Sequence, residues 1–256
     1  MRIRGFAPST PCWVELTTTD PDRAADFYAG LFGWELDGDR FLLDGRAIAG
    51  LSGSRPGRPE GWATYLAAPD LDDTAERVLS AYGRILTRPE ERAGARSAIV
   101  ADAGGALFGL WQARGFAGTQ LRGEPGTMAW SDLLTDDVAA ATAFYGSVFG
   151  WALTHEFGSG EWLTEARDSV AGLITGRYEN RWQPSFQVAD STELVDDVAR
   201  LGGRVAAGPV EMGLGRYVEI IDPLGAAFAI TAPVPRPVEL SVAYNDIIGF
   251  ELTYGG

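Results

Sequence analysis

The segment that decides the fold is WVELTTTDPDRAADFYAGLFGW at residues 13–34, because it returns as WSDLLTDDVAAATAFYGSVFGW at residues 130–151. A constant offset of 117 residues, from Trp13 to Trp130, aligns the two copies without a gap. In this alignment the two copies share a tryptophan at each end and a Phe-Tyr (FY) pair between them. The chain therefore contains a tandem repeat, which constrains the architecture more than any local pattern does.

A second pair of segments repeats as well. WATYLAAPDLDDTAERVLSAYGR, which begins at Trp62, matches WQPSFQVADSTELVDDVARLGGR, which begins at Trp182, at an offset of 120 residues. The same offset places the DxxGA turn at Asp102–Ala106 on the turn at Asp222–Ala226. Each half of the chain thus divides again, which gives four modules at about residues 11–59, 61–116, 128–177 and 181–233.

Each module has the same predicted order of elements. Cys12–Thr18 alternates apolar and polar residues, as a half-buried strand does. Thr19-Asp20-Pro21 is typical of a helix start, and Gly33 is typical of a helix end. In the last module a helix is followed by three short β-rich runs, at residues 204–207, 217–221 and 226–231. The sequence therefore predicts β-α-β-β-β, four times.

This pattern resembles the vicinal oxygen chelate superfamily, also called the glyoxalase/bleomycin resistance/extradiol dioxygenase family. The resemblance rests on DPDRAADFYAGLFGW, on DDVAAATAFYGSVFGW, on the two DxxGA turns and on the repeats, and it covers roughly residues 11–233. The chain is similar to two-domain actinobacterial members that are labelled glyoxalase-like or hydroxylase. The resemblance implies an α+β fold in which four tandem βαβββ modules form two cup-shaped mixed sheets, with helices outside.

The modules group into two expected domains and an extension. Residues 11–116 are predicted to form the first glyoxalase-like domain, and residues 128–233 the second. The stiff linker PVPRP at Pro233–Pro237 leads into residues 234–256, which are too apolar for a solvated tail. We expect this C-terminal extension to pack on the fold or on a partner.

The composition limits the possible partners. The net charge of −14 disfavours nucleic acid and anionic membranes, which bind basic surfaces. No stretch is long and apolar enough for a membrane span, and no signal peptide core is present, so a cytoplasmic monomer or homodimer is expected. A single cysteine excludes an internal disulfide, and the absence of lysine excludes Schiff-base chemistry on a lysine.

The resemblance also implies a divalent metal on the floor of the cup, held by two histidines and a glutamate. The corresponding positions here are Trp13 and Trp130, Ala63 and Gln183, and Gly109 and Ala229. Of these, only glutamine offers even a weak ligand. We therefore expect no metal and no cofactor, which argues against glyoxalase I, extradiol dioxygenase and fosfomycin-transferase chemistry.

Two repeat-related carboxylates are the candidate catalytic residues. Strand alternation points Glu15 and Asp132 into the cups, beside Trp13 and Trp130. A carboxylate against apolar aromatic surface tends to have a raised pKa, which suits acid/base work. Alternatively, each acid bonds a neighbouring arginine or a backbone amide. The candidate ligand-binding residues are Trp13, Trp130, Trp62, Trp182, Tyr65, Gln183, Arg96, Arg216 and Tyr217.

Two classes of function remain open. The first is a metal-independent cyclase, isomerase, lyase or hydratase that acts on a hydrophobic or aromatic small molecule, such as a natural-product intermediate. The second is a non-catalytic protein that sequesters a drug by stacking tryptophans on it, as in antibiotic resistance. An unpaired acid deep in a cup favours the enzyme, whereas acids held by arginines favour the binding protein.

Overall fold

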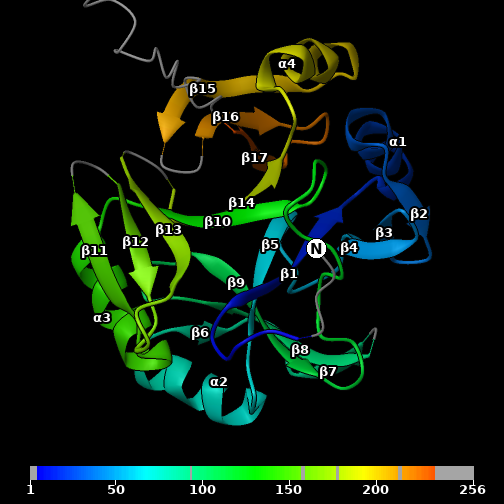
Figure 1. Ribbon diagram of the computed structural model, residues 1–256. Helices are drawn as coiled ribbons and strands as arrows, with labels where there is room; N and C mark the ends of the chain where they lie inside the picture. The colour runs from blue at the N-terminus through cyan, green and yellow to red at the C-terminus, as the bar shows by residue number, and fades with distance from the viewer. Residues whose placement is uncertain (1–4, 93, 157–158, 177–178, 213–214, 234–256) are drawn as a thin grey trace, which may run out of the picture.

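The computed structural model describes residues 5–92, 94–156, 159–176, 179–212 and 215–233 (Figure 1). Within these residues the four modules follow one another in the predicted β-α-β-β-β order, and the second module carries one additional short strand. No helix in this part of the chain has the length and apolar character needed to span a membrane. The predicted extension, 234–256, lies outside the described residues.

The elements have the following bounds. The first module comprises β1 (Pro11–Thr18), α1 (Pro21–Phe32), β2 (Glu35–Asp37), β3 (Arg40–Leu43) and β4 (Arg46–Gly53). The second comprises β5 (Gly61–Ala67), α2 (Leu71–Ser80), β6 (Arg84–Ile85), β7 (Glu90–Arg92), β8 (Ala95–Ala101) and β9 (Leu107–Ala113). The third comprises β10 (Met128–Thr135), α3 (Val138–Phe149), β11 (Ala152–Glu156), β12 (Ser159–Leu163) and β13 (Ser169–Thr175). The fourth comprises β14 (Arg181–Gln187), α4 (Ser191–Arg200), β15 (Arg204–Met212), β16 (Gly215–Ile221) and β17 (Ala227–Ala232).

The repeated segment encodes the same strand-to-helix transition twice. The Asp20 side chain caps α1 by accepting a hydrogen bond from the Arg23 backbone N–H, and Asp137 caps α3 in the same way. Both helices end at a glycine with a φ of 71°, Gly33 and Gly150, in the left-handed region that favours glycine. The helix boundaries predicted for this segment are confirmed.

Each domain forms one curled mixed sheet (Figure 1). The first has the strand order β2-β3-β4-β1-β5-β9-β8-β6, with β7 paired to β8, and the second has the order β11-β12-β13-β10-β14-β17-β16-β15. Antiparallel β1 and β5 form the centre of the first sheet, and antiparallel β10 and β14 form the centre of the second. We call the concave faces of these sheets the first cup and the second cup.

The two sheets pack together through their convex faces. One core cluster joins α1 and its sheet to residues of the fourth module, such as Phe186 and Phe228. A second cluster joins α2 and its sheet to α3 of the third module. Thr64 on β5 and Ser131 on β10 form a buried hydroxyl–hydroxyl hydrogen bond of 3.2 Å between the backs of the sheets. The cups therefore open away from each other.

The repeated residues that carry the family resemblance build this interface. The Tyr28 hydroxyl donates to Asp222 Oδ2 at 3.0 Å and accepts from Trp62 Nε1 at 2.8 Å. Asp222 Oδ1 meanwhile accepts from the backbone of its own DxxGA turn. The other copy repeats the arrangement with Tyr145, Asp102 and Trp182, at 2.9 and 2.8 Å.

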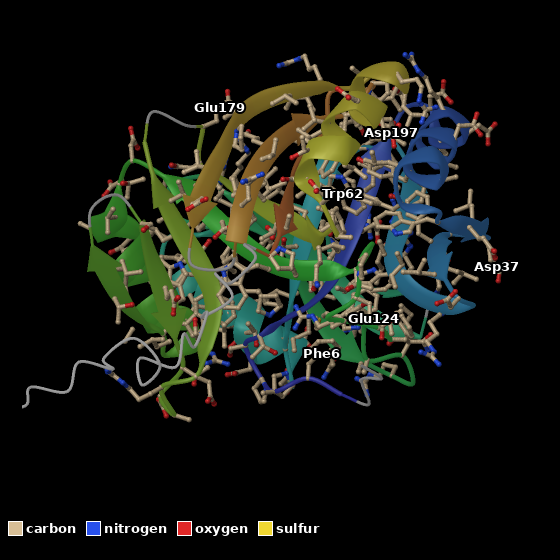
Figure 2. All side chains as sticks on the ribbon, turned by 45° about the horizontal axis from the view of Figure 1, so that its top comes forward. Phe6, Asp37, Trp62, Glu124, Glu179 and Asp197 are labelled. Carbon is tan, nitrogen blue, oxygen red and sulfur yellow. The ribbon has the colours of Figure 1, made fainter. Side chains whose placement is uncertain are left out.

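The prediction that Trp62 and Trp182 bind a ligand is wrong. Both indoles are buried in the core between the sheets, because they project from the convex faces of β5 and β14. Figure 2 shows Trp62 inside the molecule, whereas Asp37 and Glu179 lie at its edge. Trp62 and Trp182 therefore belong to the interface between the domains.

The interface predicts a clear effect of Tyr28→Phe. The substitution removes a buried donor to Asp222 and leaves the Trp62 N–H without its acceptor. We expect the free energy of unfolding to fall by about 1–3 kcal/mol, the usual cost of a lost buried hydrogen bond to a charged group. Urea unfolding measures this change, with Tyr82→Phe, an 88% exposed tyrosine, as the control. An unchanged unfolding midpoint in Tyr28→Phe would contradict the role given to this network.

Candidate functional site

The first cup is filled by its own side chains. Trp13 is only 2% exposed, and its ring meets Phe116 edge-on at a centroid distance of 5.1 Å and Trp111 at 5.9 Å. Tyr65 packs against Trp111 from the next strand, at 5.4 Å. The remaining cavity beside Trp13 has a volume of about 10 Å³. A space of this size holds at most one water, so Trp13 and Tyr65 are packing residues here.

Glu15 is held by two arginines in this filled cup. Its Oε1 lies 2.9 Å from Arg58 Nη1 and 2.5 Å from Arg92 Nη1, and it also accepts from the Ser52 hydroxyl at 2.9 Å. Arg58 donates in addition to the Tyr65 hydroxyl at 3.1 Å. Because two guanidinium groups and a hydroxyl donate to this carboxylate, it is suited to holding the cup together rather than to proton transfer.

The arginines proposed from the repeat, Arg96 and Arg216, lie elsewhere. Arg96 makes a two-pronged pair with Asp72 of α2 at 2.6 and 2.9 Å, and Arg216 reaches Thr192 of α4 at 3.5 Å. Both side chains project from the helix-covered faces of their sheets. The prediction that they contact a ligand in the cups is wrong, because strand alternation sends them to the opposite face.

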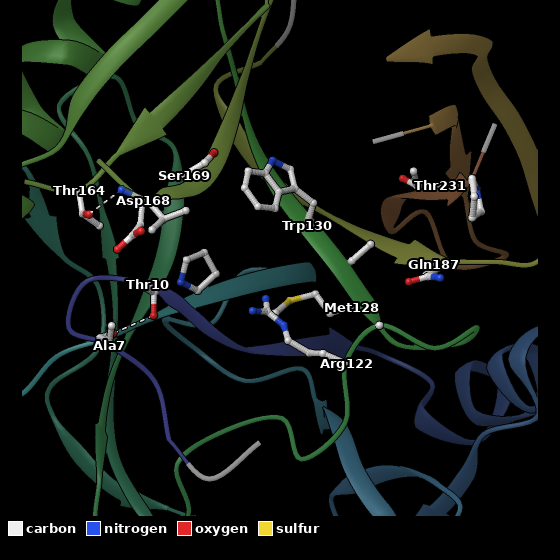
Figure 3. Close-up of a pocket in the computed structure, with 15 residues that line it drawn as sticks. Ala7, Thr10, Arg122, Met128, Trp130, Thr164, Asp168, Ser169, Gln187 and Thr231 are labelled. Atoms are coloured by element: carbon white, nitrogen blue, oxygen red, sulfur yellow. Dashed lines mark hydrogen bonds between the residues drawn. The ribbon is translucent and has the colours of Figure 1, made fainter. Parts of the chain in front are cut away.

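The second cup is open. A cavity of about 480 Å³ lies at one end of it, within the range that binds small organic molecules. Trp130 of β10 and Thr231 of β17 line the cavity from the sheet, and Thr10, Arg122 and residues 168–170 close its other sides (Figure 3). Figure 3 shows the Arg122 guanidinium directed into the space between Thr10, Met128 and Trp130.

Two substitutions between the repeats explain why one cup is filled and the other is open. At the 120-residue offset, Tyr65 corresponds to Ser185 and Trp111 corresponds to Thr231. The strand pairing agrees, because Trp13 lies opposite Tyr65 and Trp130 lies opposite Ser185. Small polar side chains thus stand where the first cup has large rings, and one of them, Thr231, lines the cavity beside Trp130.

Asp132 lies next to Trp130 on the concave face of the second sheet, opposite Gln183. Its side chain is buried, and burial raises the pKa of its carboxyl to about 7. Within the described residues its oxygens have no hydrogen bond and no ion pair. The carboxyl packs against Gly172, where a methyl group would collide with it, and does not itself line the cavity. A carboxyl with a pKa of about 7 changes its protonation state near neutral pH.

A polar network lies next to Asp132 in the second cup. The Gln183 amide group donates to the Tyr217 hydroxyl at 2.6 Å. Its carbonyl oxygen accepts from Arg181 Nη2 at 3.0 Å, and Arg181 also pairs with Glu219 at 2.5 Å. Burial, and after it the nearby charge of Asp132, raises the pKa of Tyr217 far above its usual range. The structure thus brings the candidates Trp130, Asp132, Gln183 and Tyr217 together in one cup.

Comparison with known families agrees with this architecture. Residues 12–110 match the Glyoxalase/Bleomycin resistance protein/Dioxygenase superfamily, and residues 129–231 match the Glyoxalase-like domain family. The chain belongs to the glyoxalase/bleomycin resistance/dioxygenase superfamily. The fold is also that of the Mn(II)-bound glyoxalase from Novosphingobium aromaticivorans, with a TM-score of 0.62 at 14% identity, covering 90% of this chain and 89% of that one.

Relatives within the superfamily match nearly the whole chain. A protein described as putative glyoxylase CFP32, from Mycobacterium bovis, is 34% identical over 90% of this chain and 97% of its own length. The anthracycline biosynthesis protein DauV from Streptomyces sp. strain C5 is 32% identical over 93% of this chain and 96% of its own. DnrV from Streptomyces peucetius, described in the same words as DauV, is 32% identical over 88% and 94%.

The superfamily's metal position does not fit the residues present. In the first cup the Tyr65 ring lies over Gly109, so closely that a methyl group there would collide with it. In the second cup Gln183 offers its amide oxygen to Arg181, and neither Trp130 nor Ala229 can bind a metal. Among the described residues there is no cluster of three histidine, cysteine or acidic side chains that could hold a metal ion.

Several contributing residues were not predicted from the sequence. Arg58 lies in the connection between the first two modules and Arg92 on the additional strand β7, where no periodicity reveals their direction. Arg122 follows the first domain in a connecting segment. The replacement of Tyr65 and Trp111 by Ser185 and Thr231 was the available signal, because aligning the repeats shows which cup has lost its filling.

Proposed function

We propose that this protein binds a hydrophobic aromatic small molecule in the second cup and acts on it by carboxylate acid/base chemistry without a metal. The observation that carries the proposal is the buried Asp132, with a pKa of about 7 and no bonded partner in the described chain, next to Trp130 at the cavity. A general base works best when its pKa is close to the working pH. The reaction classes that fit are cyclisation, isomerisation, lysis and hydration.

The relatives support the kind of substrate. DauV and DnrV are described as anthracycline biosynthesis proteins. An anthracycline contains flat, fused aromatic rings. A flat ring system suits a cavity walled by an indole, because offset stacking on aromatic rings adds about 0.5–1.5 kcal/mol to the burial of apolar area. We therefore infer a polyketide-like aromatic ligand of the size that about 480 Å³ accommodates.

Sequestration without chemistry is the alternative function. Its support is Glu15, the repeat-related carboxylate, which two arginines hold in the filled first cup. A protein of this kind would bind the ligand as tightly as the enzyme does but would return it unchanged. Incubating the protein with candidate aromatic polyketides and analysing the products by mass spectrometry separates the two functions.

Trp130→Ala tests where the ligand binds. With an anthracycline aglycone as the probe, we expect the dissociation constant to rise about tenfold or more, since a lost stacked indole costs over 1.4 kcal/mol. Trp13→Phe is the matched control, because Trp13 lies in the filled cup and its ring contacts are partly kept. Quenching of tryptophan fluorescence and calorimetry measure the binding. Equal affinity in Trp130→Ala and the parent would exclude the second cup as the site.

A further inference from the structure

The direction of the hydrogen bonds around Gln183 is fixed by chemistry. An arginine guanidinium only donates, so the group of Gln183 that faces Arg181 has to be its carbonyl oxygen. The amide NH₂ group therefore faces Tyr217 and donates to the phenol oxygen at 2.6 Å. The same Arg181 Nη2 also donates to Glu219 Oε1, which keeps the guanidinium in this position.

The Tyr217 hydroxyl consequently accepts one hydrogen bond and keeps its own proton to donate. Within the described residues that hydroxyl has no second hydrogen-bond partner. Burial and the nearby Asp132 raise the pKa of Tyr217, so the phenol stays protonated at any physiological pH. A neutral hydroxyl that is held by an amide and has a free proton is a preorganised donor.

The donor and the carboxylate lie next to residues that line the cavity, and neither side chain lines the cavity itself. Tyr217 on β16 pairs with Thr231, which lines the cavity, and Asp132 follows two residues after Trp130, which also lines it. Residues two apart on a strand share a face, so Asp132 and Trp130 belong to the same surface. Gln183, which lies opposite Asp132 on the neighbouring strand, donates to the Tyr217 hydroxyl, so the carboxylate and the phenol share this neighbour.

We propose that Tyr217 is a catalytic hydrogen-bond donor that stabilises an enolate oxygen while Asp132 moves the proton on the neighbouring carbon. This rests on the function proposed above and narrows its substrate to an enolisable ketone carried by an aromatic skeleton. An aspartate base combined with a tyrosine donor in an apolar site is an established solution for moving a proton next to a ketone.

The step balances without any co-reactant. The Asp132 carboxylate takes a proton from the carbon next to the ketone, the C–H electron pair forms a C=C bond, and the carbonyl π electrons move to oxygen. That enolate oxygen accepts the hydrogen bond from Tyr217. Asp132 then returns the proton by one of two routes. Where the ketone carries a β,γ double bond, the enolate is a dienolate, and protonation at its γ carbon isomerises the substrate. Where the enolate carbon attacks a second carbonyl of the substrate, the proton goes to the alkoxide so formed, and a ring closes.

The test uses 4-nitrophenolate, an aromatic oxyanion that imitates the enolate, and 4-nitroanisole, its neutral isostere. Both are titrated at mildly alkaline pH into Asp132→Asn, which imitates the protonated base and removes charge repulsion with the probe. Adding Tyr217→Phe is expected to weaken 4-nitrophenolate binding about 10- to 100-fold, the value of a hydrogen bond to a charged group. Binding of 4-nitroanisole should stay within about twofold, which also shows that the cup is still folded.

Control variants and alternative outcomes separate the two proposals. Tyr82→Phe in the same Asp132→Asn background should leave both dissociation constants unchanged, because Tyr82 is 88% exposed. If both probes bind and Tyr217→Phe weakens them equally or not at all, the donor role is wrong while the site itself stands. If neither probe binds, or if Trp130→Ala affects neither, the proposed site and the donor role fail together.

Discussion

Asp132→Asn is expected to raise the free energy of unfolding by about 4 kcal/mol at about pH 8, although it removes the candidate catalytic group. The carboxyl is buried, its pKa is about 7, and it has no bonded partner among the described residues. Its ionised form is therefore much less stable in the folded protein than in the unfolded chain, where a normal aspartate pKa is about 3.9. Asparagine keeps the shape without the charge.

The pH dependence follows from the direction of this shift. Between about pH 4 and pH 7 the folded state binds more protons at this site than the unfolded state, so the parent loses stability as pH rises. Below about pH 4 both states are protonated and the destabilisation disappears; above about pH 7 it is constant. The gain in Asp132→Asn should therefore be near zero in acid and should grow to its full size at neutrality.

Urea unfolding of the parent and Asp132→Asn across this pH range measures the difference between them, in which the many other carboxylates cancel. Asp168→Asn, on the exposed rim of the cavity, is the matched control and should show no such pH-dependent gain. Parallel curves for the parent and Asp132→Asn would mean that Asp132 titrates as an ordinary aspartate. Once a substrate is known, turnover should fall about 10²- to 10⁴-fold in the stabilised variant.

Much of the fold could be predicted because the repeated residues are structural. The interface between the domains contains the FY pair, the DxxGA turn and the tryptophans at residues 62 and 182. Both copies use these residues for the same hydrogen bonds, so the same residue types are present in both. The same residues do not indicate where a ligand binds. A tryptophan that recurs at the same position of both copies can form a buried hydrogen bond to tyrosine just as readily as it can contact a ligand.

The site resides instead in the differences between the copies. Strand alternation placed Glu15 and Asp132 correctly on the concave faces, but it could not show that arginines hold only one of them. At the 120-residue offset, Arg58 and Arg92 correspond to a tyrosine and a methionine. The second copy therefore lacks both cations by sequence. The position of an arginine side chain in a loop depends on tertiary packing. The periodicity of the sequence does not predict that position.

Glu15→Gln is expected to lower the free energy of unfolding by about 3–5 kcal/mol, the usual cost of removing one partner from a buried ion pair. The Arg58 side chain is 2% exposed and the Arg92 side chain 18% exposed. Water therefore cannot fully solvate either guanidinium in place of the lost carboxylate. Arg58 keeps Glu90 and the Tyr65 hydroxyl, which limits the loss to the lower part of this range.

The role of Glu15 is tested by comparing Glu15→Gln with variants that leave no unpaired charge in the first cup. Replacing Glu15, Arg58 and Arg92 together by leucine, methionine and methionine should cost much less than Glu15→Gln, because no unpaired buried charge remains. Arg96→Ala, which breaks an exposed pair with Asp72, should leave the unfolding midpoint unchanged.

Probe binding in the second cup should be the same in Glu15→Gln as in the parent, since the two cups open on opposite sides of the shared core. A stable Glu15→Gln protein that no longer binds the anthracycline probe would reverse the assignment and make the first cup the site.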